Sequence, residues 1–281
     1  MLRVAQNIYT IVVMTDFIHF YCINLNRNKG RWNTFINQPA INDIKRYPFE
    51  RVEAVDGKTL DINNDYRISL RAKRDIKEGT RRSHEDIVSV GAIGCYLSHV
   101  DTWKKIIDNK EPYAVVFEDD VMLPNNFMQL LLEGISDMDY LSNTPDLWTF
   151  SYGWPSYYST KGLIPPQDIA ENNIGSWIIN THPGGTCGYL ITRKGAEKLL
   201  RHAFPIDVQV DFYMCICIEL NHITCVANRA LILDAFNNVS NIQQISPCLI
   251  CDVPTNLYPH IVGLLIVSAG LIFISYKISH V

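Results

Sequence analysis

The chain has 281 residues, of which 47% are hydrophobic and 19% are charged. This length and composition exclude a disordered chain and allow one large α/β domain or two small ones. The formal net charge of −4 gives no electrostatic reason to expect nucleic acid as a partner.

The first part of the chain predicts two strands, a charged segment and a helix. We expect strands over 18–25 and 49–55, because both are rich in aromatic and β-branched residues. A polar, basic loop follows the first strand. Residues 61–86 carry many charges and fit either a mobile surface loop or a substrate lid. An amphipathic helix is predicted over 93–107, where apolar residues recur every three to four positions.

The second part alternates strands and helices. Residues 113–117 form an uninterrupted apolar run, which is typical of a strand buried on both faces. Further elements are predicted at 125–135 (helix), 147–151 and 187–192 (strands), 195–202 and 208–220 (helices) and 223–233 (one or two strands), with a loop-rich segment at 152–183. The alternation predicts an α/β fold with a mostly parallel sheet.

The cysteines do not resemble a disulfide framework. Six of the eight lie in apolar runs, where a free cysteine behaves as a small hydrophobic residue. Cys248 and Cys251 form a single CxxC without a second ligand pair, so we predict structural cysteines and no zinc site there.

The C-terminal segment is the candidate membrane anchor. No residue from 253 to 276 carries a formal charge, which predicts a transmembrane helix over 257–276. A buried C-terminal helix or strand is the alternative. No cleavable signal peptide is evident, so we expect a single-pass membrane protein with its catalytic domain in the cytoplasm. The expected division is an extension (1–17), a catalytic domain (18–245), a linker (246–256) and the membrane helix.

An acidic triplet carries the main functional signal. Glu118, Asp119 and Asp120 follow the buried strand directly, and three adjacent carboxylates repel one another unless solvent or a cation compensates them. In an extended segment Glu118 and Asp120 point to the same side. Two such oxygen ligands suit Mg²⁺ or Mn²⁺ and leave positions open for diphosphate oxygens. A solvated turn is the alternative.

The order of six segments along the chain resembles glycosyltransferase family 25, which includes lipooligosaccharide and procollagen galactosyltransferases. The matching segments are 21–27, 54–57, 91–99, 116–121, 188–191 with 195–196, and 205–207. The resemblance implies a GT-A fold and an inverting transfer of a hexose, galactose or glucose, from a UDP-sugar. The implied acceptor is a hydroxyl of a glycan, a lipid-linked glycan or a protein. The implied cofactor is Mn²⁺ or Mg²⁺.

The resemblance also implies roles for individual residues. Asp120 is the expected metal ligand, and Glu118 is expected to bind the metal through water. The expected donor-binding residues are Asn24, Leu25, Arg27, Arg31, Gly94, Ser98, His99 and Asp119. Three of these have a second interpretation. Arg31 fits a surface cation, Gly94 fits close helix packing, and His99 fits a structural role.

Asp207 and Asp211 are the candidates for the catalytic base. They are four residues apart and share one face if the stretch is helical. Asp207 is preferred because it follows Pro205-Ile206 as in the family, while Asp211 fits acceptor binding or helix capping.

Two departures from the family pattern support a competing hypothesis. Asn26 stands where many relatives carry aspartate, and Ala92 stands where many bacterial members carry glutamate. The alternative is therefore a non-catalytic, membrane-anchored, glycan-binding relative. A Mg²⁺-dependent phosphotransferase ranks last, because no aspartyl nucleophile or glycine-rich phosphate loop follows the first strand.

Overall fold

The computed structural model describes residues 18–79, 81–138, 144–151, 168–172 and 175–236. The strands are β1 (Ile18–Asn24), β2 (Phe49–Glu53), β3 (Tyr113–Glu118), β4 (Val121–Met122), β5 (Leu147–Thr149), β6 (Asp168–Asn172), β7 (Gly175–Ile179), β8 (Gly188–Thr192), β9 (Cys225–Asn228) and β10 (Asp234–Ala235). The helices are α2 (Lys29–Ile36), α3 (Ile41–Ile44), α4 (Leu70–Glu78), α5 (Val90–Asn109), α6 (Phe127–Met138), α8 (Arg193–Leu200) and α9 (Val210–Glu219), with a 3₁₀ turn η1 (Gly57–Thr59).

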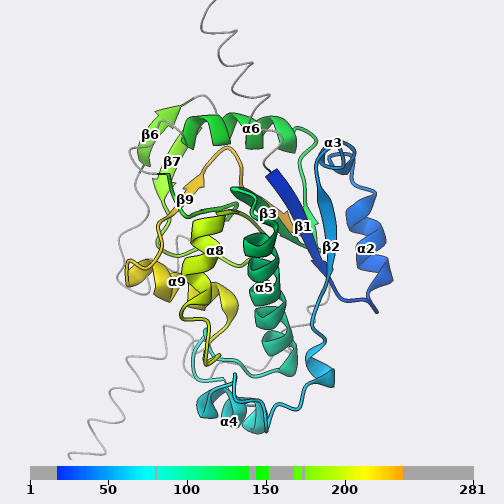
Figure 1. The fold of residues 1–281 in the computed structure, drawn as a ribbon, viewed down its shortest axis with the longest axis vertical. Coiled ribbons are helices and arrows are strands. Elements are labelled where there is room, and N and C mark those ends of the chain that lie inside the picture. Colours follow the sequence, from blue (N-terminus) through cyan, green and yellow to red (C-terminus); the bar gives the residue numbers. More distant parts are fainter. Residues whose placement is uncertain (1–17, 80, 139–143, 152–167, 173–174, 237–281) are drawn as a thin grey trace, which may run out of the picture.

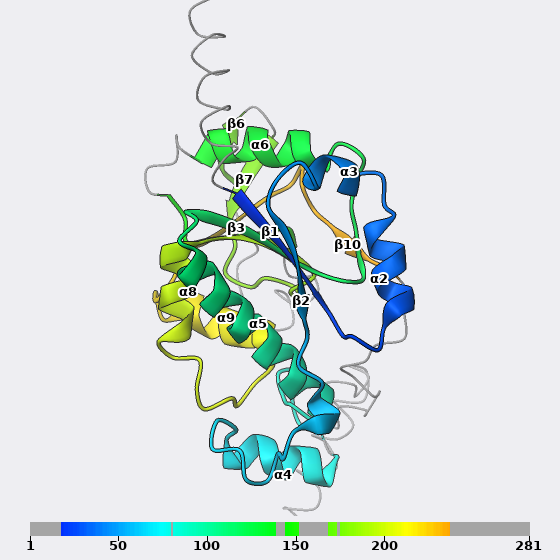
Figure 2. The same cartoon turned by 45° about the vertical axis from the view of Figure 1, so that its right-hand side comes forward.

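A central sheet organises the described residues. Its eight strands have the order β2-β1-β3-β8-β5-β9-β7-β6, and β4 pairs separately with β10. Within the sheet only β8 and β7 run against the other six strands. Helices α5, α8 and α9 cover one face, whereas α2, α3 and α6 lie on the other (Figures 1 and 2). The predicted α/β fold with a mostly parallel sheet is confirmed.

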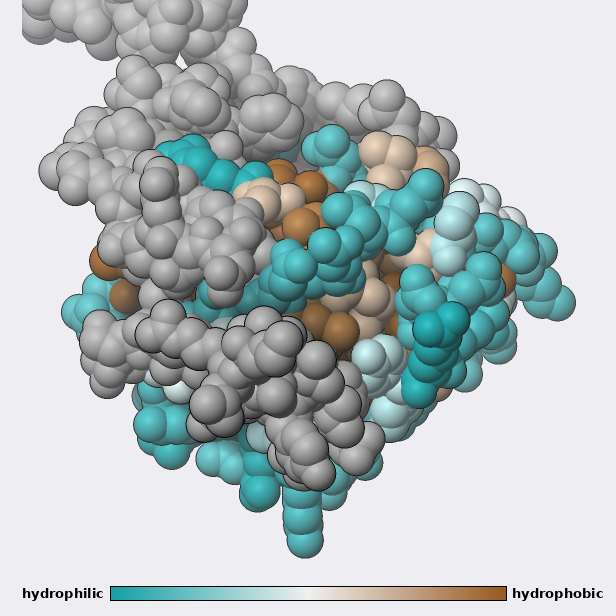
Figure 3. Space-filling view, turned by 90° about the horizontal axis from the view of Figure 1, so that it is seen from above, coloured by the Kyte–Doolittle hydropathy of each residue, from teal (hydrophilic) through white to brown (hydrophobic). Residues whose placement is uncertain are grey.

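Each face of the sheet has its own hydrophobic core, because side chains alternate along a strand. On β1, Tyr21 and Ile23 pack in the core beneath α5, whereas Phe20 and Cys22 pack in the core beneath α2 and α6. Strand β3 alternates in the same way, which explains its uninterrupted apolar sequence. In the view from above, the coloured residues on this face are mostly hydrophilic, with smaller apolar areas between them (Figure 3).

Two helices form where the sequence predicted loops. Helix α2 begins at Lys29, within the polar segment 26–31 after β1, and its Phe35 is fully buried. Helix α4 lies within the charged segment 61–86, at the lower end of the molecule in Figures 1 and 2. The Ser69 side chain caps its N-terminus, and Gly79 ends it in a left-handed conformation with φ of 64°. Apolar periodicity was a weak signal here because ion pairs hold much of α4.

The predicted membrane localisation needs correction. Within the described ranges, the structure has no helix that is both long enough and apolar enough to cross a bilayer. A single-pass membrane protein is therefore not supported. The segment predicted to span the membrane, 257–276, lies outside the described residues, as do the extension 1–17 and the linker 246–256.

Candidate active site

The acidic triplet stands where β3 ends beside β1. Glu118 is the last residue of β3 and continues the alternation toward the α5 face. Its Oε1 atom accepts a hydrogen bond from Thr186 Oγ1 at 2.5 Å and lies 3.4 Å from His99 Nε2. Strand β3, helix α5 and the segment before β8 thus meet at one carboxylate.

Asp119 and Asp120 follow Glu118 in a turn, where Arg31 of α2 supplies a cation. Arg31 pairs with both carboxylates, and its Nη2 atom lies 2.6 Å from Asp120 Oδ2. Asn24 at the end of β1 also donates to Asp119, and Arg51 Nε donates to the Asn24 side-chain oxygen at 3.0 Å. Arg31 therefore bridges the two acids rather than lying on the surface as an isolated cation.

Burial perturbs the ionisation of all three acids. Burial raises the pKa of Asp120 to about 6; Glu118 adds to this effect, whereas Arg31 opposes it. Burial also raises the pKa of Asp119, against the effects of Asn24 and Arg31. At Glu118 burial acts in the same direction, but His99 and Thr186 outweigh it, so its pKa falls below the ordinary value. The negative charges of Asp119 and Asp120 are therefore not fully compensated, whereas that of Glu118 is stabilised by His99 and Thr186.

The chemistry of these ligands fits a hard divalent cation. Oxygen-only groups suit Mg²⁺ and Mn²⁺. The raised pKa of Asp120 indicates an electrostatic demand that a second cation beside Arg31 would meet. Among the described residues, the three ligand atoms that lie within 4.8 Å of one another belong to Cys95, His99 and Glu118, whereas Asp119 and Asp120 approach each other through Arg31.

A first cavity of about 320 Å³ lies on the α2 and β2 side of the triplet. Its lining includes most of the predicted donor-site residues, namely Leu25, Arg27, Arg31, Ser98, His99 and Asp119 together with Glu118. Arg27 pairs with Asp56, which also lines this cavity. The nitrogen atom Arg31 Nε is buried without a hydrogen-bond acceptor. The cavity thus offers apolar walls, two guanidinium groups and a carboxylate rim.

Gly94 and Ser98 contact the backbone of the segment after β2, which forms part of the wall of the first cavity. A Cβ atom on Gly94 would stand 2.5 Å from the Val55 carbonyl oxygen and 2.7 Å from the Gly57 nitrogen. Ser98 Oγ accepts a hydrogen bond from Val55 N at 2.9 Å. Both residues therefore hold α5 against the segment after β2, so the close-packing interpretation describes Gly94.

His99 is fully buried between α5 and the sheet. Its Nδ1 atom lies 2.9 Å from the Tyr189 hydroxyl, which also accepts a hydrogen bond from Trp103 Nε1 at 3.0 Å. These contacts fix the imidazole so that Nε2 faces Glu118. His99 thus joins a buried polar network to the rim of the first cavity.

A second cavity of about 350 Å³ lies on the other side of Glu118. It is lined by Asp120, Asp211, Thr186, Gln209 and Ala92, among others. Asp211 lies in the first turn of α9, and burial, with Glu118, raises its pKa to about 6. Cys95 and Glu118 line both cavities. Cys95 and Glu118 therefore lie between the two cavities, with Asp119 lining the first and Asp120 lining the second.

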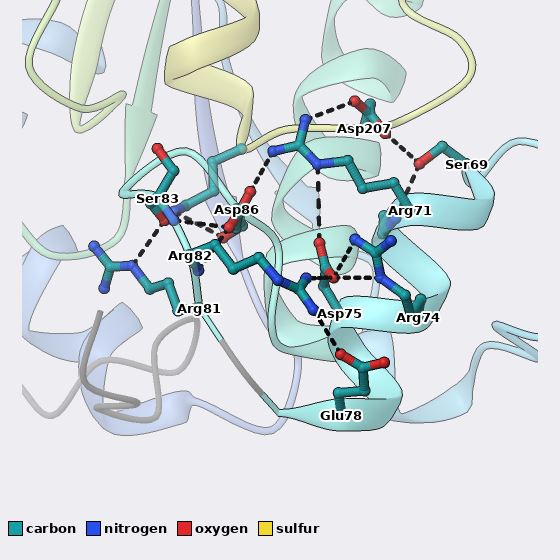
Figure 4. A network of polar contacts seen from close by, with 12 residues as sticks. Ser69, Arg71, Arg74, Asp75, Glu78, Arg81, Arg82, Ser83, Asp86 and Asp207 are labelled. Carbon is teal, nitrogen blue, oxygen red and sulfur yellow. Dashed lines mark hydrogen bonds and ion pairs between the residues drawn. The ribbon is translucent and has the colours of Figure 1, made fainter. Parts of the chain in front are cut away.

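Asp207 lies apart from both described cavities, in a network around α4 (Figure 4). Its carboxylate accepts from Ser69 Oγ at 2.5 Å and from Arg71 at 3.1 Å. Arg71 also pairs with the buried Asp86, while Arg82 pairs with the buried Asp75. Asp207 thus anchors the segment before α9 to α4, and Asp211 is the candidate base that shares a cavity with the triplet.

Sequence reasoning missed three residues that hold this site: Arg51, Thr186 and Tyr189. Arg51 orients Asn24, Thr186 holds Glu118, and Tyr189 orients His99. The alternation of side chains along β2 could have predicted on which face of the sheet Arg51 lies. No local signal identifies Thr186, because its partner is 68 residues away.

Comparison with known proteins identifies the family of the chain. A family model described as glycosyltransferase family 25 (LPS biosynthesis protein) matches residues 17–214. The chain is 27% identical to procollagen galactosyltransferase 2 of Homo sapiens over 186 residues, covering 66% of this chain and 27% of that protein. A putative glycosyltransferase of Haemophilus influenzae is 28% identical over 195 residues, covering 69% of this chain and 61% of that protein.

A third relative is named as inactive. The inactive glycosyltransferase 25 family member 3 of Mus musculus is 27% identical over 162 residues, covering 56% of this chain and 25% of that protein. The matches to these two mammalian proteins span only about a quarter of their length. Since the family model matches well over half of this chain, the chain belongs to glycosyltransferase family 25.

Proposed function

We propose that this protein is a metal-dependent, inverting glycosyltransferase of the GT-A type. The observation that carries the proposal is the acidic triplet between two cavities, with guanidinium groups lining the first and Asp211 lining the second. A transferase needs this division, because donor and acceptor must approach one reacting carbon from opposite sides. The two cavities are the donor site and the acceptor site, respectively.

The first cavity suits a nucleoside diphosphate sugar. Its apolar walls accept the nucleoside, and Arg27 and Arg31 provide paired donors for the diphosphate. The unpartnered Arg31 Nε supports this assignment, since it is a buried donor that lacks an acceptor. The donor is a UDP-hexose, and galactose is favoured because relatives are named galactosyltransferases.

Asp120 and Glu118 would hold Mn²⁺ or Mg²⁺, with Asp119 toward the donor sugar. When bound, the ion would neutralise charge on the departing nucleoside diphosphate. Arg31 shares this charge compensation, because it already contacts Asp119 and Asp120. The acceptor is a hydroxyl of a glycan, a lipid-linked glycan or a protein.

Asp211 is the proposed base. It lies in the second cavity, and its pKa of about 6 leaves it ionised at neutral pH but basic enough to accept a hydroxyl proton. As the acceptor oxygen attacks the anomeric carbon, its proton passes to Asp211 and the bond to the diphosphate breaks. Asp207 is instead a structural residue, because Ser69 and Arg71 occupy its carboxylate.

Donor hydrolysis by the full chain tests the proposal. A panel of UDP-sugars is incubated with Mn²⁺ or with EDTA, using the parent and the variants Asp120→Asn, Asp211→Asn and Asp207→Asn. We expect one donor to be consumed only with metal, and Asp120→Asn to abolish turnover. Transfer to an acceptor should fall about 10²–10⁴-fold in Asp211→Asn but stay near parental in folded Asp207→Asn.

A non-catalytic, glycan-binding protein is the second candidate. Ala92 lines the second cavity where many bacterial members carry glutamate, and two rodent relatives are named inactive or probably inactive. Donor binding without turnover by any member of the panel would favour this candidate. Equal losses in Asp211→Asn and Asp207→Asn would refute the assignment of the base.

A further inference from the structure

Cys95, His99 and Glu118 converge at the wall between the two cavities. Cys95 and His99 are four residues apart on α5, so they lie on the same face of the helix, and Glu118 reaches them from the end of β3. The thiol, imidazole and carboxylate atoms all lie within 4.8 Å of one another. The proposed transfer reaction gives the Cys95 thiol no role.

The spacing of these atoms suits a tetrahedral ion better than direct contact. His99 Nε2 and Glu118 Oε1 are 3.4 Å apart, which is long for a hydrogen bond to a carboxylate. Nitrogen and oxygen ligands at about 2.0–2.1 Å from a tetrahedral zinc ion stand roughly 3.3 Å apart. The imidazole and the carboxylate are therefore already at the separation that zinc requires. Cys95 needs a rotamer that brings its sulfur atom to the third ligand position.

Outer contacts hold two of the three ligands in place. The Tyr189 hydroxyl lies 2.9 Å from His99 Nδ1, which leaves Nε2 directed at the cluster. Thr186 Oγ1 donates to Glu118 Oε1 at 2.5 Å. Metal-binding histidines commonly have a partner of this kind on the second ring nitrogen, because it fixes the tautomer and the ring orientation.

The ligand types favour one kind of metal ion, and the two cavities provide its route of entry. A thiolate and an imidazole favour Zn²⁺ over Mg²⁺ and Mn²⁺, in contrast to the oxygen-only atoms of Asp119 and Asp120. Three protein ligands leave the fourth position of a tetrahedral ion open. Since Cys95 and Glu118 line both cavities, an ion can enter from either side.

We propose that Cys95, His99 and Glu118 bind a zinc ion, at a site that shares Glu118 with the proposed hard-cation site of Asp120 but otherwise has its own ligands. On binding, the Cys95 thiol loses its proton to solvent and the thiolate sulfur coordinates the ion. Zinc engages the carboxylate of Glu118 and occupies the passage between the cavities. If the proposed transferase function holds, zinc therefore inhibits transfer.

Cobalt and zinc titrations of the full chain test the site. Cys248 and Cys251 are first changed to serine, so that the CxxC cannot contribute a thiolate. In this background Co²⁺ should produce a thiolate-to-metal charge-transfer absorption, and calorimetry should show one zinc ion bound per chain. Cys95→Ser should remove the absorption and weaken zinc binding by at least about 10–100-fold, the range seen for loss of outer-shell support alone.

Cys187→Ser is the matched control, because Cys187 is half-buried and lines the second cavity but is outside the cluster. It should keep both the absorption and the zinc affinity. Thermal melts without metal check that each variant folds, and Cys95→Ala replaces Cys95→Ser if serine prevents folding. An absent absorption in the parent, or equal zinc affinity in the Cys95 and Cys187 variants, would overturn the proposal.

The outcome is independent of the proposed function. Turnover of a UDP-sugar without zinc binding would refute the zinc site alone. Zinc binding without any turnover would leave the zinc site standing and refute the transferase.

Discussion

Replacing Arg31 by methionine should destabilise the protein in a pH-dependent way. Methionine keeps much of the side-chain volume but removes the cation that pairs with Asp119 and Asp120. The three side chains are only 18%, 7% and 21% exposed, so solvent compensates the remaining carboxylates poorly. Removing one partner of a buried ion pair costs about 3–5 kcal/mol when the remaining charge is trapped.

Protonation lowers this cost. The pKa of Asp120 is about 6 even with Arg31 present, so neutralising it at pH 7.5 costs roughly 2 kcal/mol. We therefore expect Arg31→Met to lose about 2 kcal/mol of unfolding free energy at pH 7.5, a fall in Tm of about 4–8 °C. At pH 5 Asp120 is already mostly protonated, and the loss should shrink to about 0.5 kcal/mol.

The sign follows from the direction of the shift. Because the folded pKa of Asp120 lies above its ordinary value of 3.8, the associated stability is present below that value and is lost as pH rises through about 6. Removing Arg31 raises the folded pKa further and deepens that loss. The stability difference between parent and variant therefore widens from pH 5 to pH 7.5.

Thermal and urea unfolding of parent and variant at the two pH values measure the effect, with Arg27→Met as the control. Arg27 pairs with Asp56, and their side chains are 41% and 30% exposed. Replacing Arg27 should therefore lower the unfolding free energy by at most about 1 kcal/mol. An Arg31→Met effect that is the same at both pH values, or no larger than that of Arg27→Met, would refute the reasoning.

Three further predictions concern packing, the base and the support of the triplet. Gly94→Ala should lose about 1–3 kcal/mol in urea unfolding, because its Cβ meets the Val55 backbone, whereas Gly30→Ala has open space and should be neutral or slightly stabilising. The transfer kcat/KM should fall about tenfold per pH unit below pH 6, as Asp211 becomes protonated; a flat profile from pH 5 to 7 would contradict its role as base. Gln38→Leu should cost about 1–3 kcal/mol in thermal melts, because Gln38 satisfies two backbone groups just after the triplet; a smaller loss would show that water replaces it.

Local patterns in the sequence were sufficient for six of the eight strands of the central sheet and for the position of the acids, whereas β6 and β7 lie in the segment 152–183 that was predicted to be loop-rich. The apolar run at 113–117 predicted β3, and the adjacent triplet is at the end of that strand as expected. Periodicity also predicted α5, the longest helix described. These features depend on neighbours along the chain, so the sequence alone carries them.

The position of α4 and the proposed choice of base depend on contacts between residues that are far apart in the sequence. Asp207 and Asp211 look equivalent by spacing, but Ser69, 138 residues away, engages Asp207, while α9 directs Asp211 into the second cavity. Arg71 of α4 pairs with Asp207 of the segment before α9, whereas Asp75 and Glu78 pair with Arg82 in the segment that follows α4.

The same limit applies to the acidic site. The sequence by itself predicted the residues that carry the proposed chemistry and determined which strand presents the acids. Only the tertiary structure decided that Arg31 bridges Asp119 and Asp120, and that Cys95 and His99 face Glu118. The physical reason is that burial, ion pairing and shared cavities are properties of side chains brought together by folding, and no local periodicity encodes them.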